Sequence, residues 1–70
     1  MTATDKEPWN YEAFVALYDE IARSHPGGCP FNRGGSYTPE VLQQLYEYNT
    51  TVKTLREFAD GQFRYEQFAP

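Results

Sequence analysis

Several ingredients of a functional site are scarce in this chain of 70 residues, which has one cysteine, one histidine and six basic residues. A single cysteine excludes a disulfide within the chain. His25 and Cys29 form the one pair with metal-ligand chemistry, and only a symmetric dimer would supply enough ligands for a zinc site. Structural roles for a lone histidine and cysteine are commoner, so we expect no metal, no cofactor and no enzymatic activity.

Basic side chains are also outnumbered, because ten acidic residues give the chain a formal net charge of −4. An acidic chain repels the phosphate backbone, which disfavours direct binding of nucleic acid. If folding gathered the acidic residues on one side, they would imitate phosphates, so an acidic nucleic-acid mimic stays as a second alternative. No run of about 18 apolar residues is present, and we expect no contact with a membrane. The single cysteine and the lack of a signal-peptide pattern predict a cytoplasmic protein.

Aromatic residues, by contrast, are abundant, with one Trp, six Tyr and five Phe. A domain of this size has a marginal core. Two helices would not bury so many rings within one chain. We therefore expect a homodimer or a larger helical assembly that covers the remaining rings.

The longest apolar periodicity follows Thr38, a favourable N-cap, and Pro39, which suits the first helical position. Apolar residues then recur in steps of three and four at Val41, Leu45, Tyr48, Val52, Leu55 and Ala59. This spacing predicts one helix over 39–59, and Asp60-Gly61 is a typical stop signal.

Residues 49–52 are the weak point of that helix, because Asn49 favours caps and the three residues after it are β-branched. Two shorter helices, with Asn49 capping the second, remain the alternative. Residues 61–70 form an aromatic tail in which Phe63 and Tyr65 alternate with charged residues, and strand and helix both stay open.

An earlier apolar face contains Phe14, Leu17, Tyr18 and Ile21, and it predicts a helix over 11–24. Residues 25–37 contain four glycines and two prolines and are expected to form a loop. We therefore predict a single mainly α domain, an antiparallel hairpin of two helices of which the second is longer.

Aromatic and arginine side chains are the usual anchors of protein interfaces. The candidates for partner binding are Trp9, Phe31, Arg33, Tyr37 and Tyr46. Tyr46 lies off the main apolar periodicity, so its ring is expected to face outward. With the small size and the missing catalytic set, these residues predict a protein that binds another protein as an inhibitor or adaptor. Phage-encoded inhibitors of host machinery offer an analogy.

Arg33, Gly34, Gly35 and Ser36 stand just before the predicted helix that follows Thr38. Glycine amides, a hydroxyl and a guanidinium beside a helix N-terminus are the parts of an anion site. The alternative function is therefore binding of a small anion such as a nucleotide. The segment lacks P-loop spacing, and a glycine hinge that leads the chain into the helix is the simpler interpretation.

Overall fold

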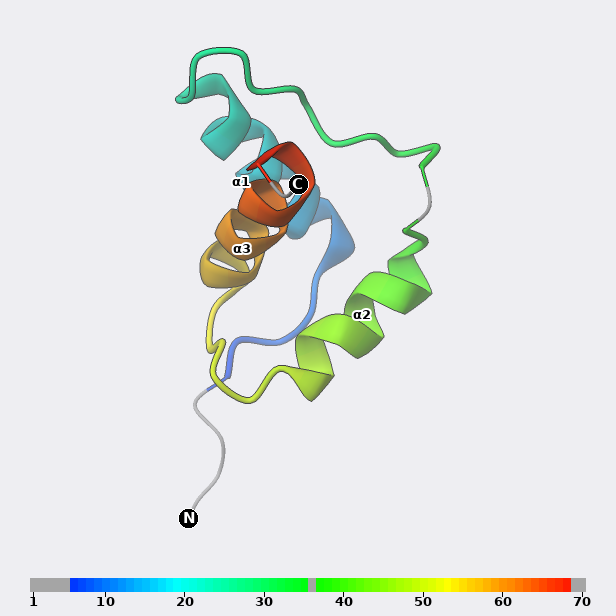
Figure 1. The fold of residues 1–70 in the computed structure, drawn as a ribbon. Coiled ribbons are helices and arrows are strands. Elements are labelled where there is room, and N and C mark those ends of the chain that lie inside the picture. The colour runs from blue at the N-terminus through cyan, green and yellow to red at the C-terminus, as the bar shows by residue number, and fades with distance from the viewer. Residues whose placement is uncertain (1–5, 36, 69–70) are drawn as a thin grey trace.

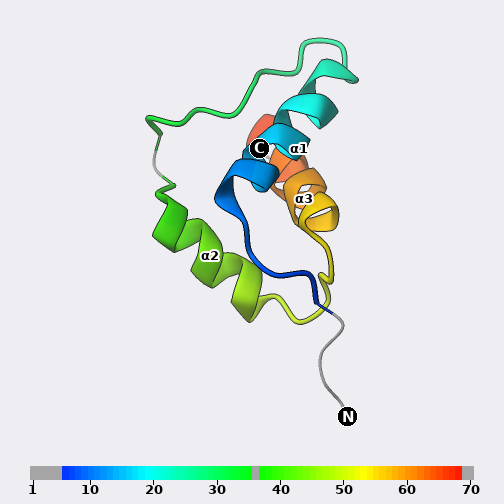
Figure 2. The same ribbon diagram turned by 180° about the vertical axis from the view of Figure 1, so that it is seen from behind.

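A computed structural model of the chain describes residues 6–35 and 37–68. Within these ranges it has three helices and no strand, namely α1 (Tyr11–Arg23), α2 (Pro39–Tyr48) and α3 (Leu55–Phe68). Helices α1 and α3 pack against each other, and α2 lies to one side of that pair (Figure 1 and, from behind, Figure 2). The predicted mainly α class is confirmed.

Helix α1 begins and ends as its sequence predicts. The Asn10 side chain accepts a hydrogen bond from the Ala13 amide at 3.1 Å, which satisfies one of the free amides of the first turn. Its buried face contains Phe14, Val15, Tyr18, Ile21 and Ala22. Ser24 caps the C-terminal end, and Gly27 takes a φ of 78°, which turns the chain away from the helix.

The single helix predicted over 39–59 is wrong. Helix α2 starts as expected, with Thr38 Oγ1 accepting from the Val41 amide at 3.2 Å. It ends at Tyr48 because Asn49 adopts an extended backbone. The Asn49 side chain accepts hydrogen bonds from the amide and the hydroxyl of Thr51, at 3.2 and 2.8 Å. These local bonds replace helical ones, as expected for an asparagine followed by β-branched residues.

Helix α3 starts at a capping box that sequence reasoning overlooked. The Glu57 amide donates to Thr54 Oγ1 at 3.1 Å, and the Thr54 amide donates to Glu57 Oε1 at 3.2 Å. A threonine followed three residues later by glutamate is a typical signal for a helix start. The alternative of two shorter helices is therefore confirmed, but Thr54 rather than Asn49 caps the second.

The stop predicted at Asp60-Gly61 is also wrong, because α3 continues through Gly61 to Phe68 and makes the tail helical. A glycine inside a helix costs about 1 kcal/mol relative to alanine. Continuing the helix buries Phe63 completely, and burial of such a side chain contributes about 1.5–3 kcal/mol. Arg64 also donates to Asp60 one turn earlier at 3.0 Å, which supports the helix across the glycine.

Helices α1 and α3 run in the same direction, so the predicted antiparallel hairpin is wrong. Phe14 on α1 lies 5.3 Å from Phe58 between ring centroids, and Tyr18, one turn later, lies 5.7 Å from Phe63. The order of contacts therefore rises along both helices. The break after Asn49 explains the difference, because it lets the second half of the predicted helix turn and pack along α1.

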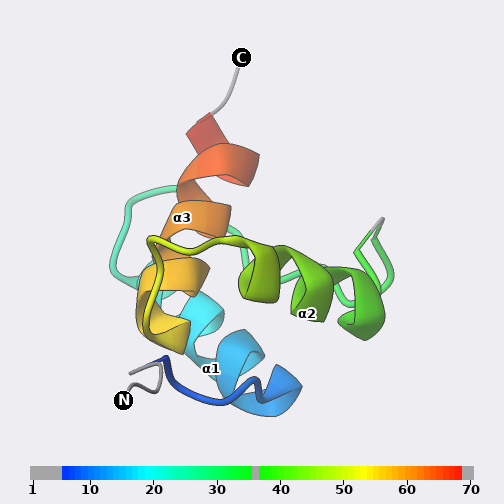
Figure 3. The ribbon, with the colours of Figure 1, turned by 90° about the horizontal axis from the view of Figure 1, so that it is seen from below.

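The segment before α1, residues 6–10, passes beside the start of α3 (Figure 3) and hydrogen-bonds both to that start and to α2. The Glu7 amide donates to the Lys53 carbonyl at 2.7 Å, and its carboxylate accepts from the Leu55 amide at 2.8 Å. The Tyr46 hydroxyl donates to the Glu7 carbonyl, and Lys6 Nζ donates to the Tyr46 carbonyl near the end of α2. These hydrogen bonds hold the segment before α1, the end of α2 and the start of α3 together.

Half of the buried core residues are aromatic, and they come from all three helices and the loop. Its buried rings are those of Phe14, Tyr18, Phe31, Tyr46, Phe58 and Phe63. Trp9, Tyr11 and Tyr37 pack partly buried against them. A third helix supplies surface for most of these rings within one chain, whereas Tyr48, Tyr65 and Phe68 stay exposed. The homodimer or larger assembly itself stays a prediction.

The buried hydroxyl of Tyr18 leads to a prediction at high pH. It donates to Glu66 Oε1 at 2.7 Å, and burial together with this hydrogen bond raises the pKa of Tyr18 from 10 to about 12. Below pH 10 the Tyr18 hydroxyl is protonated in both the folded and the unfolded state, so its titration does not change the stability. Between pH 10 and 12 the unfolded state loses the proton first, and the free energy of unfolding is expected to fall.

Urea denaturation of wild type and Tyr18→Phe between pH 8 and 12 measures this effect. The variant should be about 1 kcal/mol less stable at pH 8, because the Glu66 hydrogen bond is gone. Its stability should then fall less steeply above pH 10 than that of wild type. Equal slopes for the two proteins would contradict the assignment of the pH dependence to Tyr18.

Candidate functional site

Three of the five predicted partner-binding residues belong to the core. Trp9 is half-buried, with its ring centroid 5.6 Å from those of Phe14 and Tyr46. Phe31 is buried, and the prediction that the Tyr46 ring faces outward is wrong, because Tyr46 is only 1% exposed. Burial, helped by the nearby carboxylates of Glu7 and Glu57, raises the pKa of Tyr46 above its usual value.

Of the other two predicted residues, Arg33 is exposed on the loop, and Tyr37 packs partly buried against the core. Arg33 donates to Glu12 at 3.4 Å, and its guanidinium carbon lies 5.7 Å from the centre of the Tyr11 ring. Tyr37 is half-buried and lines a hollow of about 220 Å³ together with Glu66 and other residues. Arg33 is thus occupied by its own chain, whereas Tyr37 borders open space.

The predicted anion site is already filled by the loop's own hydrogen bonds. The Gly34 amide donates to Asn32 Oδ1 at 3.0 Å, and the Gly35 amide donates to the Asn32 carbonyl at 3.1 Å. The Arg33 guanidinium pairs with Glu12, and Ser36 lies outside the described residues. The two glycine amides therefore form a turn within the loop.

An apolar face of α2 points to solvent instead of the core. Val41 and Leu45 are each 39% exposed, and Tyr48 is 83% exposed. The three residues follow one another at spacings of four and three, so they lie along one side of the helix. We call them the outer face of α2. The sequence placed these residues on the main apolar periodicity of the predicted helix, but the helix buries Leu42 and Tyr46.

A hollow of about 220 Å³ lies where the end of α2 and the following turn meet α3, and we call it the Tyr65 hollow. Its walls are Asn49, Val52, Glu57, Phe58, Gly61, Gln62 and Tyr65. Asn49 follows Leu45 by one helical turn, so the outer face of α2 leads into this hollow. Tyr65 is 62% exposed, and Gly61 leaves the surface of α3 open between Phe58 and Tyr65.

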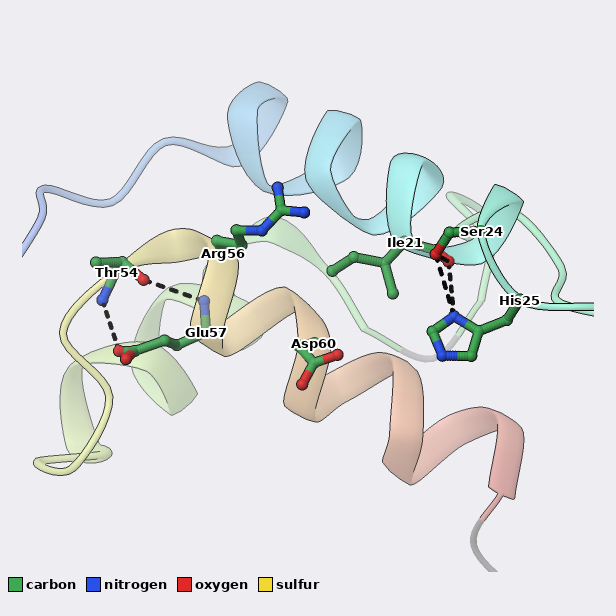
Figure 4. A pocket seen from close by; sticks show the side chains of 7 residues that line it. All are labelled: Ile21, Ser24, His25, Thr54, Arg56, Glu57 and Asp60. Carbon is green, nitrogen blue, oxygen red and sulfur yellow. Dashed lines mark hydrogen bonds between the residues drawn. The ribbon is translucent and has the colours of Figure 1, made fainter.

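A larger hollow of about 370 Å³ lies between α3 and the end of α1, and it shares Glu57 with the Tyr65 hollow (Figure 4). Its polar side chains are already engaged with their own chain. Arg56 lies 3.8 Å from Glu20, and Asp60 accepts from Arg64. Glu57 caps the start of α3. The charged side chains that line the hollow therefore already pair with groups of their own chain.

His25 borders the same hollow and has a structural role. Its Nδ1 lies 2.9 Å from the Ile21 carbonyl, which can only accept, so this nitrogen carries the hydrogen. The ring also packs 4.9 Å from Phe63 between centroids. The exposed Cys29 thiol lies 3.9 Å from the Gly27 carbonyl. Across residues 6–35 and 37–68, no three His, Cys, Asp or Glu side chains are grouped to hold a metal ion.

Comparisons with models of protein families, with curated proteins and with solved structures found no match to this chain. In the described part of the chain, none of the helices combines the length and the apolar character needed to cross a membrane. The site must therefore be judged from its own geometry. In the described part of the chain, the outer face of α2 and the Tyr65 ring at the edge of the Tyr65 hollow are apolar groups that remain exposed.

Proposed function

We propose that this protein is a small non-enzymatic module that binds another protein and acts as an inhibitor or adaptor. The observation that carries the proposal is the outer face of α2. Val41, Leu45 and Tyr48 stand next to one another and are substantially exposed. Neighbouring apolar side chains at a protein surface are typical of interaction sites, whereas isolated ones are ordinary.

The outer face is not the side by which α2 is buried in the core. Leu42 and Tyr46 on the neighbouring side of the helix are buried there, and Lys6 donates to carbonyls at the C-terminal end of α2. The helix therefore has one apolar side for its own fold and another that is available to a partner. Aromatic side chains such as Tyr48 often contribute strongly to binding energy in interfaces.

The alternative of a small anionic ligand has less support. Its expected donors, the Gly34 and Gly35 amides, are bonded to Asn32, and Arg33 is paired with Glu12. We also propose a reducing compartment such as the cytoplasm as the place of action, since Cys29 is an exposed free thiol.

The proposal is tested by affinity capture with variants that differ only in the face of α2 they alter. The immobilised full chain is exposed to a lysate of the source cells, and captured proteins are identified by mass spectrometry. Leu45→Lys places a charge in the outer face, whereas the control Gln43→Lys adds the same charge at an exposed position off that face. A true partner should be captured about tenfold less by Leu45→Lys and unchanged by Gln43→Lys.

The partner is then purified and mixed with the chain, and light scattering measures the mass of the complex. A defined complex that Leu45→Lys prevents would support the proposal. Equal capture by both variants, or no protein that forms a defined complex, would contradict it. A homodimer of the chain that Leu45→Lys breaks would assign the outer face to self-assembly instead.

A further inference from the structure

We infer that the partner presents a basic amphipathic helix, which places its apolar side on the outer face of α2 and in the Tyr65 hollow. This inference rests on the proposed function and adds the chemistry of the partner. Recognition of an amphipathic helix by an apolar groove is a common mode of protein binding. The shape of the surface and the distribution of charge around it both support this occupant.

The shape matches a helix because the surface is elongated and has two walls. On the outer face of α2, Val41 and Leu45 lie one helical turn apart. Asn49 follows Leu45 at the same spacing and lies at the edge of the Tyr65 hollow. Across the hollow, the exposed Tyr65 ring forms the opposite wall. A carbon added at Gly61 would meet no atom within 4 Å, so the α3 surface is open at this point.

The charges bordering this surface are mainly acidic, and the one basic group that contacts its wall is Lys6, whose Nζ donates to the Asn49 carbonyl at 2.8 Å among the described residues. Glu57 lines the Tyr65 hollow, and Glu66 lines the neighbouring hollow at Tyr37. Helix α2 carries Glu40 and Glu47 and has no lysine or arginine. Among the described residues that line these two hollows, none is basic. A partner with lysine or arginine flanking its apolar side would therefore be attracted and oriented.

The basic residues of α3 lie on the other side of the helix. Arg56 lines the hollow between α1 and α3 and pairs with Glu20, and Arg64 pairs with Asp60 of that same hollow (Figure 4). Glu57 borders both hollows, so the two sides of α3 differ in the position of the arginines, and the residues of α3 that line the Tyr65 hollow are only acidic or uncharged. A second copy of this chain is a poor occupant, because it brings the same acidic surface and a net charge of −4.

The test uses two synthetic helical peptides of ~18 residues with the same leucine face, about five turns long. One carries lysine on its polar side and the other carries glutamate. Titration of the isotopically labelled full chain is followed by NMR, and calorimetry gives affinity and stoichiometry. The lysine peptide should bind as a one-to-one complex at least tenfold tighter than the glutamate peptide, with shifts centred on Leu45 and Tyr65. Its affinity should fall severalfold between low and high salt.

Three variants separate docking from simple attraction to an acidic protein. Leu45→Glu adds a negative charge, so it would strengthen purely electrostatic binding, but it should weaken docking about tenfold. Combined Glu57→Gln and Glu66→Gln should weaken binding and reduce its salt dependence. The matched control, Glu12→Gln with Glu20→Gln, removes two charges from α1 and should have a much smaller effect.

Tighter binding by Leu45→Glu, or equal losses for the two double glutamine variants, would overturn the inference by showing attraction to net charge alone. Equal affinity for the two peptides would overturn it as well. These results are independent of the capture experiment. A partner whose binding depends on Leu45 but that presents an acidic or uncharged helix would support the proposed function. It would contradict only the inference that the helix is basic. A dimer of the chain that depends on Leu45 would mean that a second copy of the chain, and not another protein, occupies this surface.

Discussion

Replacing Phe14 by alanine is expected to lower the free energy of unfolding by about 3–5 kcal/mol. Phe14 is completely buried, and its ring centroid lies 5.3 Å from that of Phe58 on α3 and 5.4 Å from that of Phe31 in the loop. Trp9 packs on it from the N-terminal segment at 5.6 Å. One side chain therefore connects α1 with three other parts of the chain.

A domain of 70 residues has about 4–10 kcal/mol of stability in total, so this loss should leave much of the variant unfolded. Urea denaturation followed by circular dichroism measures it. Tyr48→Ala removes another aromatic ring and serves as the control. Because Tyr48 is 83% exposed, its loss should change stability by less than about 0.5 kcal/mol. Similar losses for both variants would mean that the outer face of α2 is part of the fold.

Gly28→Ala is expected to destabilise the protein by about 2 kcal/mol through crowding. A carbon added at Gly28 would lie 2.5 Å from the Ala22 carbonyl oxygen and 3.1 Å from the end of the Phe63 ring. The carbonyl is backbone and already accepts from the His25 amide at 3.2 Å, so it cannot move without disturbing the end of α1. Either this helix end or the buried Phe63 ring must shift.

Gly61→Ala is the matched substitution, and its effect should have the opposite sign. Gly61 lies within α3, and an added carbon meets nothing within 4 Å. Alanine should therefore stabilise the protein by about 0.5–1 kcal/mol through its higher helix propensity. Thermal and urea denaturation of both variants test the pair. A destabilising Gly61→Ala would argue against a helix that is continuous across this position.

The elements with strong local signals were predictable from the sequence. Helix α1 follows from the periodic Phe14, Tyr18 and Ile21 and from the Asn10 cap. The start of α2 follows from Thr38 and Pro39. Both starts depend on hydrogen bonds and backbone angles within one turn, so the sequence nearby contains the information. The capping box at Thr54 carried an equally local signal, which the apolar periodicity running across it concealed.

The candidate site was predictable only in its chemistry. Aromatic anchors and an acidic balance were evident, but two residues chosen for partner binding, Phe31 and Tyr46, are core residues. The exposed residues Val41, Leu45 and Tyr48 belong to the main apolar periodicity and were not among the residues chosen for partner binding. Helix α2 has apolar residues on two sides, and periodicity alone does not say which side faces the rest of the chain. That choice depends on Glu7 and Trp9, which are distant in sequence and contact Tyr46.

The sequence by itself therefore determined a mainly helical acidic domain and the starts of two helices. It indicated a break after Asn49 only as one of two alternatives. Tertiary structure decided the direction of α3, its continuation through Gly61 and the face of α2 that is buried. The physical reason is that caps and turns are settled by neighbouring residues. By contrast, the energy that extends α3 and orients α2 comes from burying Phe63 and Tyr46 against segments far along the chain.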